Sequence, residues 1–165
     1  MHGEQRTHEL KWHDPSIGPG AARSMSGIEY LRAMRDGALP AAPVAALMDL
    51  QFDAIEPGRL VFRAVAREFF TNPIGIVHGG FAATLLDSAM GCATITVLAA
   101  GQTFATLDLH VTFVRGVKAG EELLATGTIL HRGNRLITSI SRLEDVAGKL
   151  YAHATSSCMV LSWPD

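Results

Sequence analysis

Apolar and polar positions divide the chain into strand-like regions on either side of one long apolar segment. Residues 50–55 and 59–66 have strand character and flank a turn with Pro57 and Gly58, so the pattern predicts a first hairpin. Residues 107–113 alternate apolar and polar side chains. Such alternation is typical of a strand with one face on a core and the other on solvent, a ligand or a second subunit.

Three more strand-like segments follow, at residues 122–131, 136–143 and 150–161. They are rich in Thr, Ile and Leu, which are common in strands. Turn-forming residues separate them at 132–135 and 145–148. We therefore predict that the second half of the chain forms an antiparallel meander.

The apolar segment between the two groups of strands, residues 79–99, contains a single charged residue, Asp87. Its length would permit a membrane span. Its small and hydroxyl side chains, its central carboxylate and the strands on both sides favour instead a buried helix of a soluble domain. Because a helix that is apolar all round must be covered, the pattern predicts an α+β fold with one long helix inside a curved antiparallel sheet.

The N-terminal region carries weaker signals. Residues 1–23 show no sustained periodicity, so we expect a flexible or loosely docked N-terminal arm, followed by a single domain over residues 24–165. Within the arm, His8 and His13 are five residues apart. That spacing places them on different faces of a helix and argues against a metalloprotease-type metal site.

Two short helices are predicted between the arm and the first hairpin. Ser26 and Glu29 have the spacing of a capping box, which marks a helix start, and the apolar face that follows stops at Gly37. A second helical stretch is expected around residues 44–48, after a Pro-rich break. Both helices are expected to cover the core and not to form it.

Composition narrows the possible classes of protein. The chain has 165 residues, of which 48% are hydrophobic and 18% charged, so it can bury one sizeable core and is not intrinsically disordered. The low charge favours an oligomer, whose interface covers part of the surface. A net charge of −2 disfavours nucleic acid, and two cysteines provide neither a disulfide framework nor a zinc cluster. Since the N-terminus lacks a signal-peptide pattern, we expect a cytoplasmic protein.

The candidate catalytic residues lie near the start of the long helix and along it. Asn72, His78 and Gly79 precede or open it, and Asp87 lies half a helix length further on. Glycine at a helix start lets a ligand approach free backbone amides, which can stabilise a carbonyl oxygen that gains negative charge. Because a carboxylate on an apolar helix is costly to bury, we expect a raised pKa for Asp87, which suits a general base.

Each of these residues also has an ordinary structural interpretation. Asp87 could hydrogen-bond nearby backbone, His78 could hold the preceding loop, and Asn72 could form a turn. The sequence has no nucleophile elbow, phosphate loop or dinucleotide-binding motif. Cys92 and Cys158 fall in the apolar helix and the last strand, which are usual places for structural thiols.

The order of these groups resembles a known family. The pattern Asn-x-x-Gly-x-x-His-Gly-Gly starting at Asn72, with Asp87 nine residues after the histidine, is similar to the motif of hotdog-fold acyl-CoA thioesterases of the phenylacetate-degradation (PaaI) type. Residues 106–115 resemble the strand that follows the helix in that family, and the similarity covers about residues 27–161. The resemblance implies a hotdog fold and a thioesterase without a metal or organic cofactor.

The same resemblance implies a role for each candidate residue. Asp87 would activate water or attack the acyl carbon directly, and the amide of Gly79 would polarise the thioester oxygen. Asn72 and His78 match positions that orient the thioester and the water. Thr106 matches a Ser or Thr that supports the acid or its water.

Coenzyme A contacts are implied for the turn between the second and third strands of the meander. The residues concerned are Arg132, Gly133, Asn134 and Arg135. Either arginine could pair with phosphates of coenzyme A, although a solvated turn is the alternative. Gly116 stands where the family usually has Pro, and His110 stands where a charged residue is common. Both departures concern the rim of the pocket, and therefore acyl specificity.

Helix geometry gives an argument that does not depend on the family. Gly79 and Asp87 are separated by about 12 Å at ~1.5 Å rise per residue, and the side chain recovers only about 2 to 3 Å of this distance. A carboxylate, water, carbonyl and amide in a row span about 8 to 9 Å. Two antiparallel helices across a twofold axis would bring the acid of one chain to the amide of the other. We therefore expect an obligate homodimer, paired into a tetramer as the family often is.

Three functions are consistent with the sequence. The first is hydrolysis of a small or aromatic acyl-CoA to the free acid and coenzyme A. The second is a non-catalytic acyl-CoA or acyl-carrier sensor on the same fold. The third, an enoyl-CoA hydratase, ranks lower because it needs an Asp and a His placed together, whereas His78 and Asp87 are nine residues apart. The sequence does not identify the acyl group.

Overall fold

The computed structural model of the chain describes residues 3–163 and has an α+β architecture. All the helices and strands predicted from the pattern are present, together with two short additional helices, α1 and η1. In chain order the elements are α1 (Ile17–Ala22), α2 (Gly27–Arg35), α3 (Pro43–Met48), β1 (Gln51–Glu56), β2 (Arg59–Val65), the 3-10 helix η1 (Glu68–Phe70), α4 (Gly79–Ile95), β3 (Gln102–Phe113), β4 (Glu122–Arg132), β5 (Leu136–Asp145) and β6 (Leu150–Ser162).

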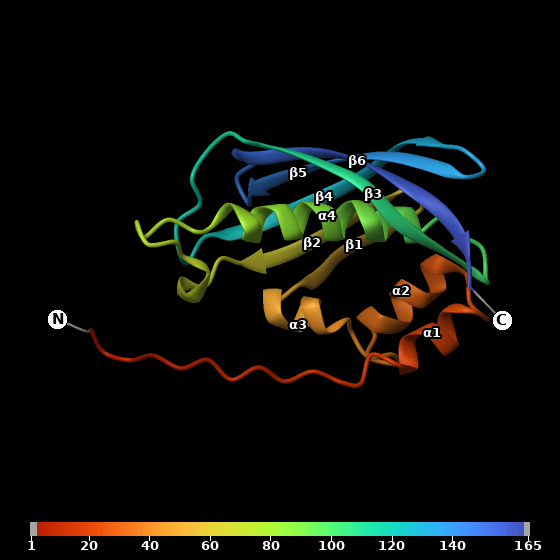
Figure 1. The fold of residues 1–165 in the computed structure, drawn as a ribbon, viewed down its shortest axis with the longest axis horizontal. Coiled ribbons are helices and arrows are strands. Elements are labelled where there is room, and N and C mark those ends of the chain that lie inside the picture. The colour runs from red at the N-terminus through yellow and green to blue at the C-terminus, as the bar shows by residue number, and fades with distance from the viewer. Residues whose placement is uncertain (1–2, 164–165) are drawn as a thin grey trace.

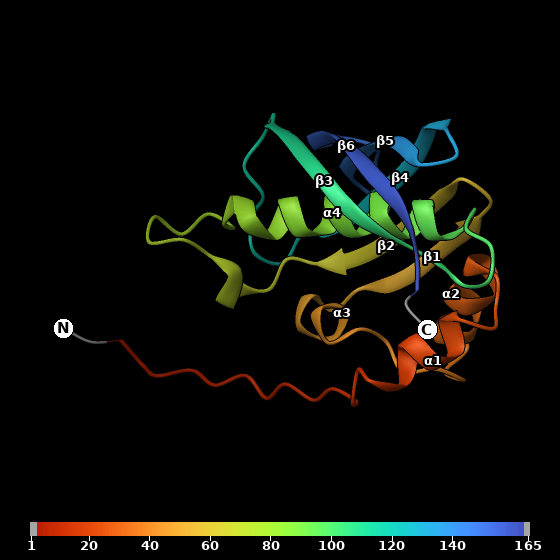
Figure 2. The ribbon, with the colours of Figure 1, turned by 45° about the vertical axis from the view of Figure 1, so that its right-hand side comes forward.

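The six strands form one sheet with the order β1-β2-β4-β5-β6-β3, and every neighbouring pair is antiparallel. The long helix α4 runs through the middle of the molecule, and the sheet curves around it (Figures 1 and 2). Leu85, Leu86 and Met90 of α4 are fully buried in the main core. The predicted fold, one long helix inside a curved antiparallel sheet, is confirmed and is the hotdog fold.

The place of β3 corrects the prediction of a simple meander. β4, β5 and β6 are consecutive neighbours, but β3 pairs with β6 at the far edge of the sheet and not with β4. A helix that is apolar on most of its surface needs cover on more than one side. At the far edge, Phe104 of β3 reaches α4 so closely that a Cβ at Gly91 would lie 2.9 Å from its ring.

Close backbone approach fixes the position of α4 against the sheet. A Cβ at Gly127 of β4 would lie 2.3 Å from the carbonyl oxygen of Ala89. The start of α2 approaches the C-terminal end of α4 in the same way, since a Cβ at Gly27 would lie 1.8 Å from the carbonyl oxygen of Ile95. Only glycine fits at either contact, because each of these distances is far shorter than a van der Waals contact.

The N-terminal helices α1 to α3 lie together beneath β1 (Figure 2). The predicted capping box is present at the start of α2, where Ser26 and Glu29 satisfy each other's backbone amides. α1 lies inside the segment predicted as a flexible arm, and its two glycines hid it from the pattern. Packing against α2 accounts for this helix. Gly18 is buried against the hydroxyl of Tyr30, and a Cβ at this position would lie 2.7 Å from that oxygen.

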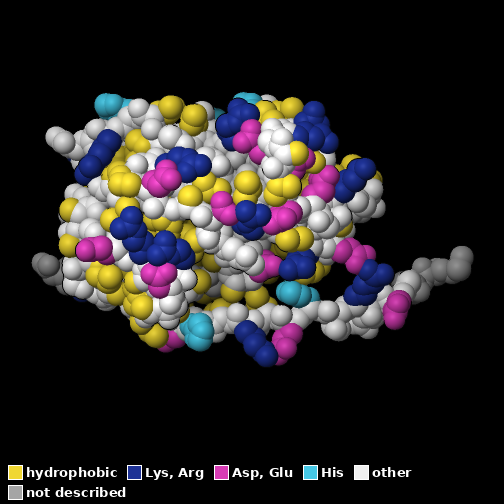
Figure 3. All heavy atoms as spheres, turned by 180° about the vertical axis from the view of Figure 1, so that it is seen from behind, with side chains coloured by type: hydrophobic (Ala, Val, Ile, Leu, Met, Phe, Trp, Pro, Cys, Tyr) yellow, Lys and Arg dark blue, Asp and Glu magenta, His cyan; other side chains and the backbone are white. Residues whose placement is uncertain are grey.

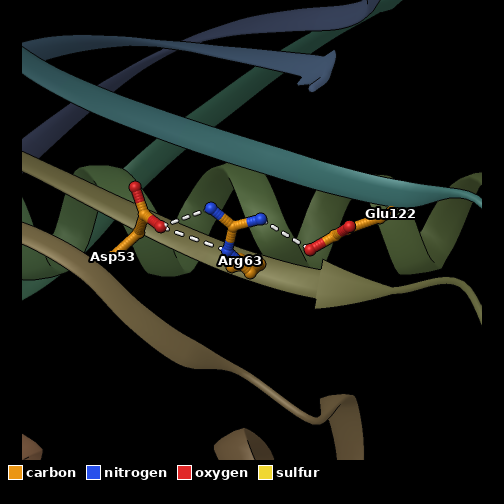
Figure 4. Close-up of polar contacts among 3 residues, drawn as sticks. All are labelled: Asp53, Arg63 and Glu122. Carbon is orange, nitrogen blue, oxygen red and sulfur yellow. Dashed lines mark hydrogen bonds and ion pairs between the residues drawn. The ribbon is translucent and has the colours of Figure 1, made fainter. Parts of the chain in front are cut away.

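A charge network lies on the outer surface of the sheet at β1, β2 and β4. Arg63 of β2 pairs with Asp53 of β1 at 2.7 Å and with Glu122 of β4 at 2.5 Å, so one guanidinium links three strands (Figure 4). Acidic and basic side chains are mixed on the face seen in Figure 3, without a large basic patch. Among residues 3–163, no helix combines the length and the apolar character that crossing a bilayer requires.

Candidate active site

The loop before α4 is held by the side chain of Asn72. Its Oδ1 accepts hydrogen bonds from the amides of Ile74 at 3.1 Å and Ile76 at 3.2 Å. Its own backbone amide donates to the carbonyl of Ile76 at 2.8 Å. Asn72 is therefore a turn residue, as its alternative interpretation proposed, and its Nδ2 amide group is the part that is left for a ligand.

His78 caps the first turn of α4. Its Nδ1 accepts from the amide of Gly80 at 2.9 Å, and its carbonyl accepts from the amide of Phe81 at 3.0 Å. The side chain of His78 therefore caps the helix, and its backbone amide, which donates to the carbonyl of Phe70 at 2.8 Å, ties the end of the preceding loop to η1. The next amide, that of Gly79, has no acceptor among the described residues and is thus a free donor at the positive end of the helix.

A cavity of about 300 Å³ opens beside this free amide. Its lining includes His78, Gly79 and Phe113, together with Arg115 and Gly116 from the segment after β3. The Phe113 ring lies over the helix end, where a Cβ at Gly79 would approach it to 3.1 Å. Glycine therefore keeps the amide open to the cavity.

Asp87 lies at the middle of α4 and is half-buried. Burial raises the pKa of its carboxyl, and a hydrogen bond with the Thr106 side chain lowers it by a smaller amount. The expected raised pKa is confirmed. The structure also places Thr106 of β3 beside the acid, as the resemblance implied for the residue at this position.

The structure does not bring all the predicted residues into one site. His78 and Gly79 line the cavity at the start of α4, whereas Asn72, in the preceding loop, and Asp87, at the middle of the helix, do not. The turn residues Arg132, Gly133 and Asn134 line a separate cavity of about 110 Å³ with Leu98 and Gln102, beyond the far end of α4. Within one chain, the amide, the acid and the turn are therefore three separate groups along the helix.

Neither cysteine has the properties of a nucleophile. Burial raises the pKa of the Cys92 thiol to about 12, and the nearby Asp87 adds to the effect. Burial also raises the pKa of the Cys158 thiol. A thiol that stays protonated at neutral pH is a poor nucleophile, so both cysteines are structural.

Sequence reasoning did not single out Phe113 and Arg115, which line the cavity beside Gly79. Arg115 donates to the carbonyl of Leu150, so it also holds the wall of the cavity. The signal available in the sequence was their position at the end of the alternating strand and just after it. Gly116 does line the cavity, whereas His110 lies exposed on β3 and does not.

A hotdog fold with a free helix-end amide in a cavity, and an acid further along the same helix, has the groups that thioester hydrolysis requires, and the comparisons with known proteins identify the class. Residues 74–151 match the family model of the thioesterase superfamily. Human acyl-coenzyme A thioesterase 13 is 32% identical over 97 residues, which cover 58% of this chain and 69% of the human protein. The chain belongs to the thioesterase superfamily and is a thioester hydrolase.

Two solved structures extend the comparison. A phenylacetic acid degradation-related protein from Ralstonia eutropha is 31% identical, with a TM-score of 0.74 over 79% of this chain and 98% of that protein. A Streptococcus mutans protein with bound acetyl-CoA is 22% identical, with a TM-score of 0.64 over 70% of this chain and 91% of that protein, and this likeness concerns the fold alone. Together with the family match, the likeness to the Ralstonia protein confirms the resemblance drawn from the sequence.

Proposed function

We propose that this protein hydrolyses a small or aromatic acyl-CoA thioester to the free acid and coenzyme A. The observation that carries this proposal is the free amide of Gly79 in a cavity of about 300 Å³ at the start of the helix that also bears Asp87. A backbone amide aimed at a carbonyl oxygen stabilises the negative charge that develops on it. A half-buried carboxylate can accept the proton of the attacking water.

The chemical step follows from these two groups. Asp87 takes a proton from water while the water oxygen bonds to the acyl carbon, and the oxyanion is stabilised by the Gly79 amide. The carbon–sulfur bond then breaks, and the proton on Asp87 passes to the leaving sulfur. In the alternative route, a carboxylate oxygen attacks first and forms an anhydride that water hydrolyses. Single turnover in ¹⁸O-water identifies the anhydride route if label appears in Asp87, which requires an anhydride whose aspartyl carbonyl carbon is attacked by water.

Two further residues orient the reactants in this mechanism. The Nδ2 group of Asn72 is available to donate to the thioester or to water, since its Oδ1 is occupied by the turn. His78 has Nδ1 occupied by the cap and presents its other ring nitrogen. Thr106 lies beside Asp87, and in this mechanism its hydroxyl keeps the carboxylate oriented.

The site is proposed to be shared between two subunits. Among residues 3–163, β3 has a neighbouring strand on one side only, and this edge carries Leu107, Leu109 and Phe113, which are 55%, 36% and 56% exposed. A long edge strand with exposed apolar side chains is a ready surface for pairing with another chain. An antiparallel partner would bring its Asp87 to this chain's Gly79, and two such dimers would form the tetramer.

The same arrangement would bring the turn after β4 toward the partner's site. The turn consists of Gly133, Asn134 and Arg135, with Arg132 at the end of β4. The two arginines are exposed, so their guanidinium groups are available to phosphates of coenzyme A. In this proposal the turn selects the coenzyme A portion, and the cavity beside Gly79 accepts the part of the substrate next to the carbonyl.

A thiol-release screen over short, medium, long and aromatic acyl-CoAs tests the proposal. We expect turnover that falls by two or more orders of magnitude in Asp87→Asn, the usual loss for a general base. Ser88→Ala, which removes a polar group from the next position of α4, is the matched control. Tight binding of acyl-CoA without thiol release would identify a sensor instead, and hydration of enoyl-CoA without thiol release would identify a hydratase.

The oligomeric part of the proposal has its own test. Sedimentation at several protein concentrations, with activity measured in parallel, should show activity only in the dimer or a larger assembly. A fully active monomer would disprove the shared site. In that case Asp87 and Gly79 would have to act within one chain.

A further inference from the structure

The N-terminal arm contacts the segment that precedes α4. Residues 3–14 lack regular secondary structure and run along the side of the molecule, with charged side chains that project from the ridge they form (Figures 1 and 3). Arg6 forms an ion pair with Glu68 of η1. The His8 ring stacks on Phe69 with centroids 4.3 Å apart and planes 29° apart. The arm is thus attached to η1 at two neighbouring points.

Aromatic contacts continue from His8 into the first turn of α4. Phe69 contacts Phe70 with ring centroids 4.4 Å apart, and Phe70 contacts Phe81 at 4.6 Å. Phe81 is buried and lies two residues after Gly79. Four rings therefore connect the exposed arm to the helix turn that presents the free amide.

The backbone makes the same connection. The carbonyl of Phe70 accepts a hydrogen bond from the amide of His78 at 2.8 Å, so Phe70 holds the cap of α4 through its backbone and the first turn through its ring. η1 has only three residues, and none of them is buried. A 3-10 turn of this length is a weak element by itself, so contacts from outside matter to its position.

A cavity lies under part of the arm. A cavity of about 330 Å³ separates it from α3 and η1, and its lining includes His8, Lys11, Leu47 and Phe69. The contacts that attach the arm to η1 are the ion pair of Arg6 and the ring contact of His8, and the His8 contact is the one that does not depend on exposed charges. Removing one ring should therefore release the arm locally without disturbing the core.

We propose that His8 is a positioning residue for the carbonyl-binding end of α4 and acts through Phe69, Phe70 and Phe81. This inference rests on the proposed role of the Gly79 amide. By keeping the first turn of α4 in place, the arm favours the orientation in which this amide meets the developing oxyanion. The Arg6–Glu68 pair is exposed and contributes little to the effect, because water screens such pairs.

The size of the effect follows from the strength of ring contacts. An aromatic pair changes an equilibrium by about two- to tenfold. We expect His8→Ala to speed amide hydrogen exchange over residues 70–81 by this factor. The kcat for acyl-CoA hydrolysis should fall by a similar factor while KM changes little, since the amide acts mainly in the transition state.

The experiment compares three variants of the full chain. His8→Ala removes the ring, His8→Phe restores a ring, and His13→Ala removes a histidine from the same arm that has no ring contact with η1 among the described residues. We expect faster exchange and lower kcat in His8→Ala only, with recovery in His8→Phe. None of these positions lies in the core, so the variants should fold.

Three results would overturn the inference. The first is unchanged exchange over residues 70–81 in His8→Ala. The second is faster exchange with an unchanged kcat, and the third is an equal effect of His13→Ala. If the wild-type protein releases no thiol from any acyl-CoA, the proposed function fails. The exchange data then test only the structural coupling of the arm to α4. Faster exchange in His8→Ala supports this coupling, and unchanged exchange refutes it.

Discussion

The substitution Asp87→Asn should make the protein more stable and less active at the same time. Partial burial raises the pKa of the Asp87 carboxyl above its ordinary value of 3.8, so the folded state binds the proton of this group more tightly than the unfolded state does. The neutral amide of Asn has nearly the same shape as the protonated acid. It avoids the cost of keeping a charge in this half-buried position, but it cannot accept a proton from water.

The sign and size of the stability change follow from proton linkage. Since the folded-state pKa is the higher one, the stabilising contribution of Asp87 is fully present below pH 3.8 and is lost as the pH rises through the folded-state pKa. A tenfold difference in proton affinity between the two states corresponds to about 1.4 kcal/mol. The Thr106 side chain lowers the pKa of Asp87 and so opposes part of the effect of burial. The gain in stability expected for Asp87→Asn is therefore the effect of burial minus the effect of Thr106. The loss of activity, at least about 100-fold, corresponds to about 2.7 kcal/mol of transition-state stabilisation.

Urea unfolding between pH 3 and pH 8 measures the change in the free energy of unfolding, and thiol release measures the loss of activity. Wild type, Asp87→Asn and the control Ser88→Ala should be compared at one protein concentration, because an oligomer gains stability by mass action. The carboxyl pKa, measured by NMR in the folded protein, fixes the expected difference in free energy of unfolding. The reasoning is refuted if Asp87→Asn is no more stable than wild type at pH 7.5, or if the difference persists unchanged at pH 3.

Four other substitutions test separate parts of the structure. Thr106→Val removes the hydrogen bond that lowers the pKa of Asp87, so the acid limb of kcat/KM should move to higher pH in a pH–rate profile. Gly79→Ala puts a methyl group beside the free amide, and we expect kcat/KM to fall about tenfold or more with little change in melting temperature. Gly127→Ala forces a Cβ within 2.3 Å of a backbone oxygen of α4, so thermal unfolding should show a loss of about 1 to 3 kcal/mol or failure to fold. Arg63→Ala breaks only exposed ion pairs, and chemical denaturation should show a loss of no more than about 1 kcal/mol.

Most of the fold could be predicted because its elements have strong local patterns. The apolar segment with the single acid Asp87 is α4, and the alternating segment at 107–113 lies within β3. The position of β3 beside β6 could not be predicted, since alternation shows which side chains share a face and not which strand is the neighbour. α1 was missed because Gly18 and Gly20 are poor helix formers, and packing against Tyr30 outweighs this propensity.

The candidate site was predictable as a set of residues but not as an arrangement. The motif gave Asn72, His78, Gly79 and Asp87, and helix geometry separated the last two. The sequence could not show which atoms of these side chains are left for a ligand. In the structure, Oδ1 of Asn72 is bonded to the loop and Nδ1 of His78 is bonded to the helix cap. It also could not show that Phe113 covers the helix end, because that contact joins segments far apart in the chain.

The sequence by itself determined the long apolar helix, the acid it carries and the glycines at its start, because these depend on residues close together in the chain. Tertiary structure alone decided which amide is left free, which strand forms the edge, and how the arm with His8 reaches the first turn of α4. These features depend on contacts between distant segments, where the shapes of packed side chains and the pairing of backbone groups select one arrangement among many that the local pattern permits.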